Sequence, residues 1–214
     1  MSSGNGATPT RPAGQSGGAS QLMTGALAGG VLGLLAGNKN ARKFAGKTAG
    51  TALKLGGLAA IAAVGYTAWQ RHKGATAPGL QLPPRDSGFA IEHLPSGPDV
   101  LARGVLVAMM QGAKADGHFD AAEQTRIFAQ IEALALDAEA KAFMMDELSA
   151  PQSMARVTAY ATSPELATEL YAASLLAMDP DTPAERAYLE SLARELGIER
   201  GLAQEIETAV RNEI

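Results

Sequence analysis

Residues 164–197 read PELATELYAASLLAMDPDTPAERAYLESLARELG, and this stretch decides the fold. Pro164 and Pro183 each fit the first position of a helix, where proline is tolerated because no backbone N–H is needed there. No part of the stretch alternates apolar and polar residues as a half-buried strand would. The stretch therefore predicts two helices, one at 164–178 and one at 183–196.

Signals at the ends of these helices agree with the prolines. Thr182 and Glu185 have the spacing of a capping box, and Gly197 is a plausible C-terminal stop. Apolar residues recur at helical spacing, which predicts a core-facing stripe formed by Leu166, Leu170, Ala173 and Ala177.

Similar helix start signals recur through the C-terminal part of the chain. Asp120 with Glu123 and Ser149 with Gln152 stand at capping-box spacing, and Pro151 fits a first helical position. The predicted helices, about seven in all, span 100–115, 121–135, 138–149, 151–161, 164–178, 183–196 and 199–212. We therefore expect an all-α bundle over residues 99–214.

The first of these helices has a face of small residues. Gly104, Ala108 and Gly112 recur every fourth residue, so they share one side of the helix at 100–115. Small residues at this spacing favour close packing against a second helix.

Charge divides the chain at Arg85. Residues 1–85 carry nine Lys and Arg and no Asp or Glu, whereas residues 86–214 carry nine Lys and Arg against 22 Asp and Glu, or −13. A basic arm beside an acidic domain favours an anionic surface for the first part and cations or basic partners for the second. Nucleic acid is not expected as a partner, because the acidic domain would repel phosphate.

The N-terminal part has the composition of a tail followed by a membrane anchor. Residues 1–21 contain almost nothing apolar to bury, which is typical of a disordered tail. The run 22–37 is uncharged, and glycines at i and i+4 form a stripe that suits helix packing in lipid. The members of this stripe are Gly25, Gly29, Gly33 and Gly37.

A second apolar run, 51–69, has 19 residues, close to the length that spans a bilayer. Its flanks carry residues that prefer a membrane interface, namely Lys54, Tyr66, Trp69, Arg71 and Lys73. We expect residues 22–73 to form a membrane anchor with one span or a helical hairpin. The alternatives are that these runs are buried helices of a soluble domain or flexible linkers.

Residues 74–98 hold five prolines and no long apolar periodicity, so they are expected to form a linker. Some of its apolar residues could dock on a surface, namely Leu80, Leu82, Phe89, Ile91 and Leu94.

Acidic residues gather before two helix starts, in a weak internal repeat that aligns residue 123 with residue 185. The candidate metal ligands are Asp116, Asp120, Glu123, Asp179, Asp181 and Glu185. Carboxylates without cysteine favour a hard divalent cation, Ca²⁺, Mg²⁺ or Mn²⁺, whereas capping of helices by the same acids is the simpler interpretation.

The run 113–123, AKADGHFDAAE, resembles the signature of TerB-like domains, helical modules named from tellurite resistance. The layout from Gly37-Asn38-Lys39 through Trp69 to the bundle is similar to the YebE-like family of bacterial inner-membrane proteins of unknown function. The resemblance covers most of residues 22–214. It implies inner-membrane localisation, an acidic cation-binding surface and a role in membrane-associated stress response.

No set of acid, base and nucleophile emerges from the sequence, so we expect no enzyme. The function expected is that of a membrane-anchored adaptor in envelope or metal-related stress, which contacts the lipid bilayer and binds a partner protein. The alternative is a structural membrane protein that forms homo-oligomers through its glycine stripe.

Overall fold

The computed structural model describes residues 57–91, 97–117, 138–178 and 180–213. In these ranges the chain forms helices and no strand, which confirms the expected all-α fold. The helices are α4 (Gly57–His72), α5 (Gly97–Ala113), α7 (Ala138–Ser149), α8 (Met154–Thr158), α9 (Pro164–Leu176), α10 (Pro183–Glu195) and α11 (Arg200–Glu213).

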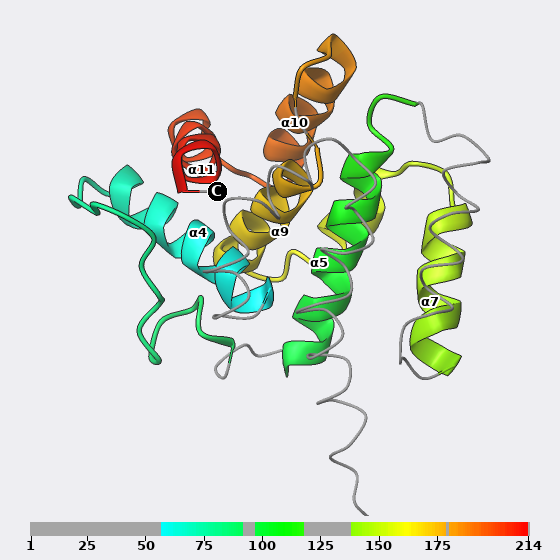
Figure 1. Cartoon of the computed structure of the whole chain (residues 1–214), viewed down its shortest axis with the longest axis horizontal. Coiled ribbons are helices and arrows are strands. Elements are labelled where there is room, and N and C mark those ends of the chain that lie inside the picture. The colour runs from blue at the N-terminus through cyan, green and yellow to red at the C-terminus, as the bar shows by residue number, and fades with distance from the viewer. Residues whose placement is uncertain (1–56, 92–96, 118–137, 179, 214) are drawn as a thin grey trace, which may run out of the picture.

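Helix α9 lies at the centre of the bundle (Figure 1). All of its residues from Leu166 to Leu175 are buried, because α5, α4, α10 and α11 contact it on different sides. A helix that is covered all round needs small side chains as well as large ones, and α9 supplies both. The stripe predicted at Leu166, Leu170, Ala173 and Ala177 is buried in this core.

The two ends of α10 match the sequence signals. Thr182 caps the helix by accepting a hydrogen bond from the backbone N–H of Glu185, whose side chain accepts one from the Thr182 backbone in return. Gly197 has φ +69 directly after the helix, and the N–H of Ile198 donates to the carbonyl of Ala193. Capping box and C-terminal stop are both confirmed.

The connection before α9 differs from the prediction. Pro151 and Gln152 were expected inside a helix at 151–161, but α8 is a single short helix with Ser153 as its N-cap. The cause is a polar contact with α5, since the Ser153 N–H donates to Gln111 Oε1 at 2.7 Å. This bond holds the preceding residues in an extended connection.

The small-residue face of α5 packs against α9 as predicted. A Cβ added at Gly112 would lie 2.8 Å from the carbonyl oxygen of Ser174, and one at Gly104 would lie 2.9 Å from the Cβ of Tyr160. Between them the Ser174 hydroxyl donates to the carbonyl of Ala108 at 2.9 Å. The two helix backbones can approach this closely only because the face lacks larger side chains.

Helix α4 is packed in the protein core, which is the buried-helix alternative that the sequence left open for this run. The run 51–69 was expected to form part of a membrane anchor, yet its described portion packs against α9 and α11, with Ala62, Ala63 and Val64 almost fully buried. Small apolar side chains suit close packing in lipid and in a protein core equally, which is why composition did not separate the two. In the ranges that the structure covers, no helix is both long and apolar enough to cross a bilayer.

The segment after α4 folds back on it. Phe89 is 3% exposed and packs edge-on against Tyr66 and Trp69, and the N–H of Gln81 donates to Thr67 Oγ1 at 2.9 Å. Leu80 and Ile91 also pack against the core, whereas Leu82 is 56% exposed. Docking of this predicted linker is thus confirmed for three of its apolar residues, and Leu94 lies outside the described residues.

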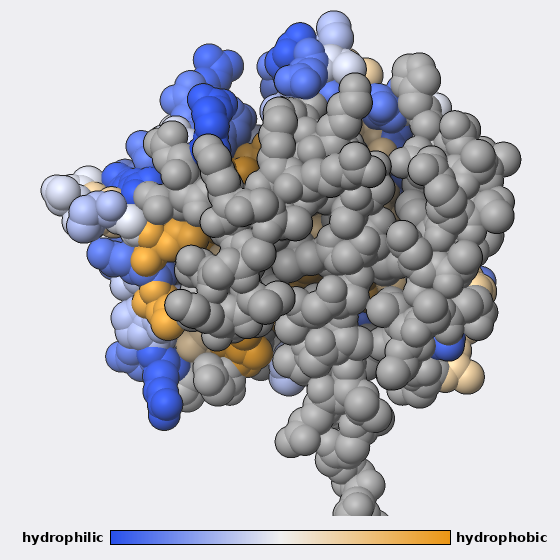
Figure 2. All heavy atoms as spheres, in the orientation of Figure 1, coloured by the Kyte–Doolittle hydropathy of each residue, from blue (hydrophilic) through white to orange (hydrophobic). Residues whose placement is uncertain are grey.

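On the face shown in Figure 2, hydrophobic side chains gather around α4 and hydrophilic ones cover α10 and α11.

Candidate functional site

The predicted metal ligands are only partly described. Asp116 is half-buried in the turn after α5, Asp181 is exposed before α10, and Glu185 completes the capping box with Thr182. Asp120, Glu123 and Asp179 lie outside the described residues. Among the residues that are described, no three carboxylates or imidazoles gather as a metal site would require. The divalent-cation site stays a prediction.

The residues predicted to lie in or at a membrane are also only partly described. Gly25, Gly29, Gly33, Gly37 and Lys54 lie outside the described residues. Tyr66, Trp69, Arg71 and Lys73 are described, and all four contact their own chain. The Arg71 guanidinium donates to the carbonyl of Ala77 at 2.8 Å, for example, and so fixes the turn after α4.

A buried polar network that sequence analysis missed joins α5, α7 and α8. The carboxylate of Glu147, whose side chain is 2% exposed, accepts hydrogen bonds from Gln111 Nε2 at 2.6 Å and from the guanidinium of Arg156. The Lys114 ammonium donates to the backbone carbonyls of Glu147 and Ala150. Each buried polar group therefore has a partner, as a stabilising network requires.

The network also shifts the ionisation of its members. Burial alone would raise the pKa of Glu147, but hydrogen bonds from Arg156 and Gln111, together with the charges of Arg156 and Lys114, outweigh burial and lower the pKa. Burial lowers the pKa of Lys114, although the Glu147 charge opposes this effect. The Glu147 carboxylate is buried and fully hydrogen-bonded, and only Arg156 reaches solvent, which is typical of a structural network.

A second buried acid, Glu169, lacks hydrogen-bond partners of this kind in the described part of the chain. Glu169 on α9 is 0% exposed, and neither carboxyl oxygen has a hydrogen-bond partner among the described residues. Its side chain lies beside Gly65 of α4, where an added Cβ would be 3.5 Å from Glu169 Cγ. Burial, helped by the charge of Glu165 one turn earlier, raises the pKa of Glu169 well above its usual range. The folded chain therefore keeps this carboxyl protonated where the unfolded chain ionises it.

This difference predicts a pH-dependent stability. As pH rises above 4.5, the unfolded chain loses the Glu169 proton and the folded chain retains it, so stability falls until the folded pKa is passed. Glu169→Gln removes the titrating group, and we expect it to make the stability less dependent on pH between about 5 and 8. Urea unfolding of both chains at several pH values measures the difference. Parallel pH profiles for the two chains would show that Glu169 ionises equally in both states.

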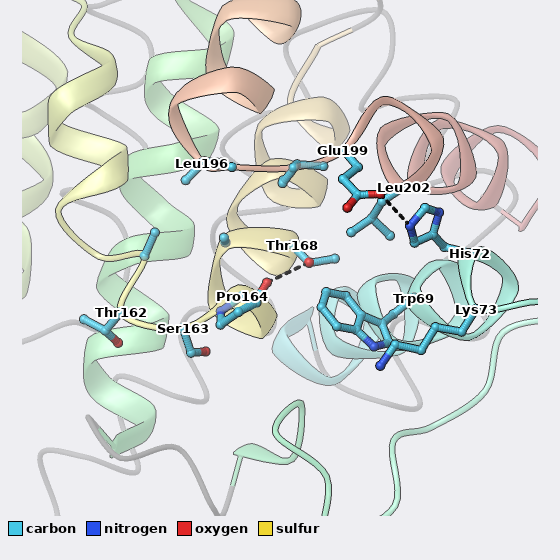
Figure 3. Close-up of a pocket in the computed structure, with 14 residues that line it drawn as sticks. Trp69, His72, Lys73, Thr162, Ser163, Pro164, Thr168, Leu196, Glu199 and Leu202 are labelled. Carbon is cyan, nitrogen blue, oxygen red and sulfur yellow. Dashed lines mark hydrogen bonds and ion pairs between the residues drawn. The ribbon is translucent and has the colours of Figure 1, made fainter.

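An open cleft of about 560 Å³ lies where α4, the start of α9 and the α10–α11 turn meet (Figure 3). We call it the Trp69 cleft. Its lining residues are Trp69, His72, Lys73, Ala161, Thr162, Ser163, Pro164, Ala167, Thr168, Leu196, Gly197, Ile198, Glu199 and Leu202.

The α4 side of the cleft carries its aromatic ring and its cations. The Lys73 ammonium lies 4.7 Å from the centroid of the Trp69 ring, and Phe89 supports that ring edge-on from the core. His72 Nε2 lies 3.3 Å from the Glu199 carboxylate across the cleft (Figure 3), and its ring packs against Gly201. These contacts hold the C-terminal end of α4 against the start of α11.

Two hydroxyl groups of the opposite wall, those of Ser163 and Thr168, are hydrogen-bonded to backbone atoms. Ser163 Oγ accepts from the N–H of Leu166, and Thr168 Oγ1 donates to the carbonyl of Pro164 at 2.8 Å (Figure 3). The imidazole of His72 pairs with a carboxylate and not with either hydroxyl. The arrangement suits binding of an apolar group beside polar ones, as ligand sites generally do.

Sequence analysis singled out Trp69 and Lys73 but assigned them to a lipid interface. The cleft is lined by residues from α4 to α11 that are more than a hundred positions apart in the chain. Local sequence patterns do not predict that such distant residues lie close together.

A family model described as "Protein of unknown function (DUF533)" matches residues 21–210. No curated protein and no solved structure matches the chain.

Proposed function

We propose that this chain, which belongs to the DUF533 family of proteins of unknown function, is a membrane-anchored adaptor and not an enzyme. Its acidic, TerB-like helical part would bind a partner protein at the Trp69 cleft. The YebE-like layout supports placement at a bacterial inner membrane, with a role in envelope or metal-related stress. The glycine-rich run 22–37 would contribute to the anchor.

One observation carries this proposal: the Trp69 cleft is an open concave site assembled from three helical elements. Its volume of about 560 Å³ is within the range of ligand pockets, and its lining combines an indole ring with aliphatic side chains and a few polar groups. Tryptophan is enriched at protein interfaces, because it buries a large apolar area and can still form a hydrogen bond.

Photocrosslinking tests the proposal in the full chain. We would place a benzophenone amino acid at Thr162, an exposed residue of the cleft, and in a control at Ala142, an exposed residue of α7. We expect irradiation of cells to give an adduct with another protein from position 162 and none from position 142.

Equal adducts at both positions, or none at 162, would contradict partner binding at the cleft. An adduct of this chain with itself from position 162 would instead favour the structural, self-associating alternative.

A further inference from the structure

We propose that the Trp69 cleft binds a peptide segment in which a large apolar side chain stands next to an acidic one. This inference rests on the proposed function and names the chemistry of the partner. It follows from the apolar lining, the charges at the cleft and the composition of the chain itself.

The apolar lining requires an apolar group in the occupant. Besides the Trp69 ring, the apolar lining includes Ala167, Leu196 and Leu202. Burying a leucine or phenylalanine side chain here would remove apolar surface of both partners from water, which is the main source of affinity in such sites. A purely polar segment would gain nothing from this lining.

The charges favour an acidic neighbour for that apolar side chain. His72 and Glu199 face each other and satisfy each other's charge when the imidazole is protonated. Lys73 is exposed above the Trp69 ring, and the described residues provide it with a cation–π contact but no ion pair. One positive charge therefore remains at the rim of the apolar lining.

The net charge of the domain favours basic partners, not acidic ones, because residues 86–214 carry −13. This attraction acts over long distances. Salt limits that attraction to about 8 Å under physiological conditions. At the Trp69 ring itself the charge within contact distance is the Lys73 ammonium, 4.7 Å from the ring centroid, and it comes from the basic first part of the chain. Local charge complementarity therefore selects an acidic residue at this position.

The N-terminal part of the same chain does not have this chemistry. Residues 1–85 contain no Asp or Glu, so no segment there can place an acid beside an apolar side chain. Residues 1–85 of a second copy are thereby excluded, and we assign the cleft to a segment of a partner protein. A segment from residues 86–214 of a second copy would instead give the self-adduct from position 162.

Trp69 is the single tryptophan of the chain and reports occupancy of the cleft directly. We would titrate the full chain with three probe peptides, Ac-Gly-Leu-Asp-Gly-NH₂, its Leu-Asn analogue and its Gly-Asp analogue, and follow the fluorescence of Trp69. We expect the Leu-Asp peptide to bind about threefold to fivefold more tightly than the Leu-Asn peptide, the range of an exposed ion pair. The Gly-Asp peptide should bind at least about tenfold more weakly, because it lacks the apolar side chain.

Lys73→Gln should reduce the affinity for the Leu-Asp peptide to that for the Leu-Asn peptide. Lys141→Gln on α7 removes the same charge away from the cleft and should leave the preference intact. Circular dichroism of each variant checks that the fold is retained.

Equal affinities for the Leu-Asp and Leu-Asn peptides, or a preference that survives Lys73→Gln, would overturn the inference. If no peptide changes the Trp69 fluorescence but position 162 still gives its adduct, the peptide chemistry is wrong and the adaptor function stands. If both experiments fail, the proposed function fails as well.

Discussion

Replacing Glu147 with alanine is expected to lower the free energy of unfolding by about 3 kcal/mol, the lower end of what breaking a buried ion pair costs. The substitution leaves the buried amide nitrogen of Gln111 without the Glu147 acceptor and removes the Glu147 charge that acts on the Lys114 ammonium. We choose the lower end because the side chain of Arg156 is 45% exposed and can turn to water. Urea unfolding at pH 7 measures the loss.

Glu139→Ala on the same helix is the matched control. Glu139 pairs with Arg103 at 2.8 Å, but its side chain is 79% exposed, and such pairs contribute at most about 1 kcal/mol. A similar loss of stability in both variants would show that burial of the Glu147 network is not what stabilises the junction of α5, α7 and α8.

The same network should make the fold sensitive to acid. Because the folded chain lowers the pKa of Glu147, its stabilising contribution is present above pH 4.5 and is lost as pH falls through the folded value. Glu147→Ala lacks this contribution at every pH, so the difference between the two chains should shrink in acid.

Gly112→Leu is expected to destabilise the fold by a similar amount, about 3 kcal/mol, through overpacking. The first atom of any side chain at this position would lie 2.8 Å from the carbonyl oxygen of Ser174, which belongs to the backbone of α9 and cannot turn aside. Leucine is a better helix former than glycine, so its intrinsic propensity would act in the opposite direction. A loss of stability therefore isolates the steric effect.

Ala187→Leu on the exposed face of α10 is the control and should change stability by less than about 0.5 kcal/mol. Thermal unfolding followed by circular dichroism compares the two substitutions. If Gly112→Leu is as stable as the parent chain, the close approach of α5 and α9 is not required by the fold.

The helical elements could be predicted because their signals are local. α7 spans the predicted range 138–149, and α9 and α10 begin at the predicted prolines. Caps and stops depend on a few neighbouring residues, so a single sequence displays them. The same holds for the small-residue face of α5, which is visible as a spacing of four.

What sequence analysis could not show depends on partners distant in the chain. Gln111 and Glu147 are 36 residues apart, and neither stands out until α5 and α7 lie side by side. Glu169 belongs to an ordinary acidic and apolar helical pattern, and its burial depends on helices that pack against α9, among them α4 at Gly65. The apolar run 51–69, which includes most of α4, has the length, glycines and interfacial flanks that also characterise membrane helices. From the sequence, packing of α4 in the core could therefore not be separated from insertion in lipid.

The sequence therefore indicated only one side of the candidate site. Trp69 and Lys73 attracted attention by their residue types, but the walls opposite them come from α9 and from the α10–α11 turn. The acidic turns were named from the sequence as candidate metal sites, with helix capping as the simpler interpretation. The structure describes Asp116, Asp181 and Glu185 of these turns, and Glu185 acts as a helix cap.

The most direct test of partner binding at the Trp69 cleft is the yield of the crosslinked adduct from position 162 when the cleft is filled. Ala167 is 4% exposed and lines the cleft, so the larger side chain in Ala167→Phe would fill part of the cleft and block the partner sterically. Ala187→Phe on α10 serves as the control, and thermal unfolding checks that both variants fold. The account predicts that the adduct disappears in Ala167→Phe and persists in Ala187→Phe, whereas an undiminished adduct in a folded Ala167→Phe chain would contradict it.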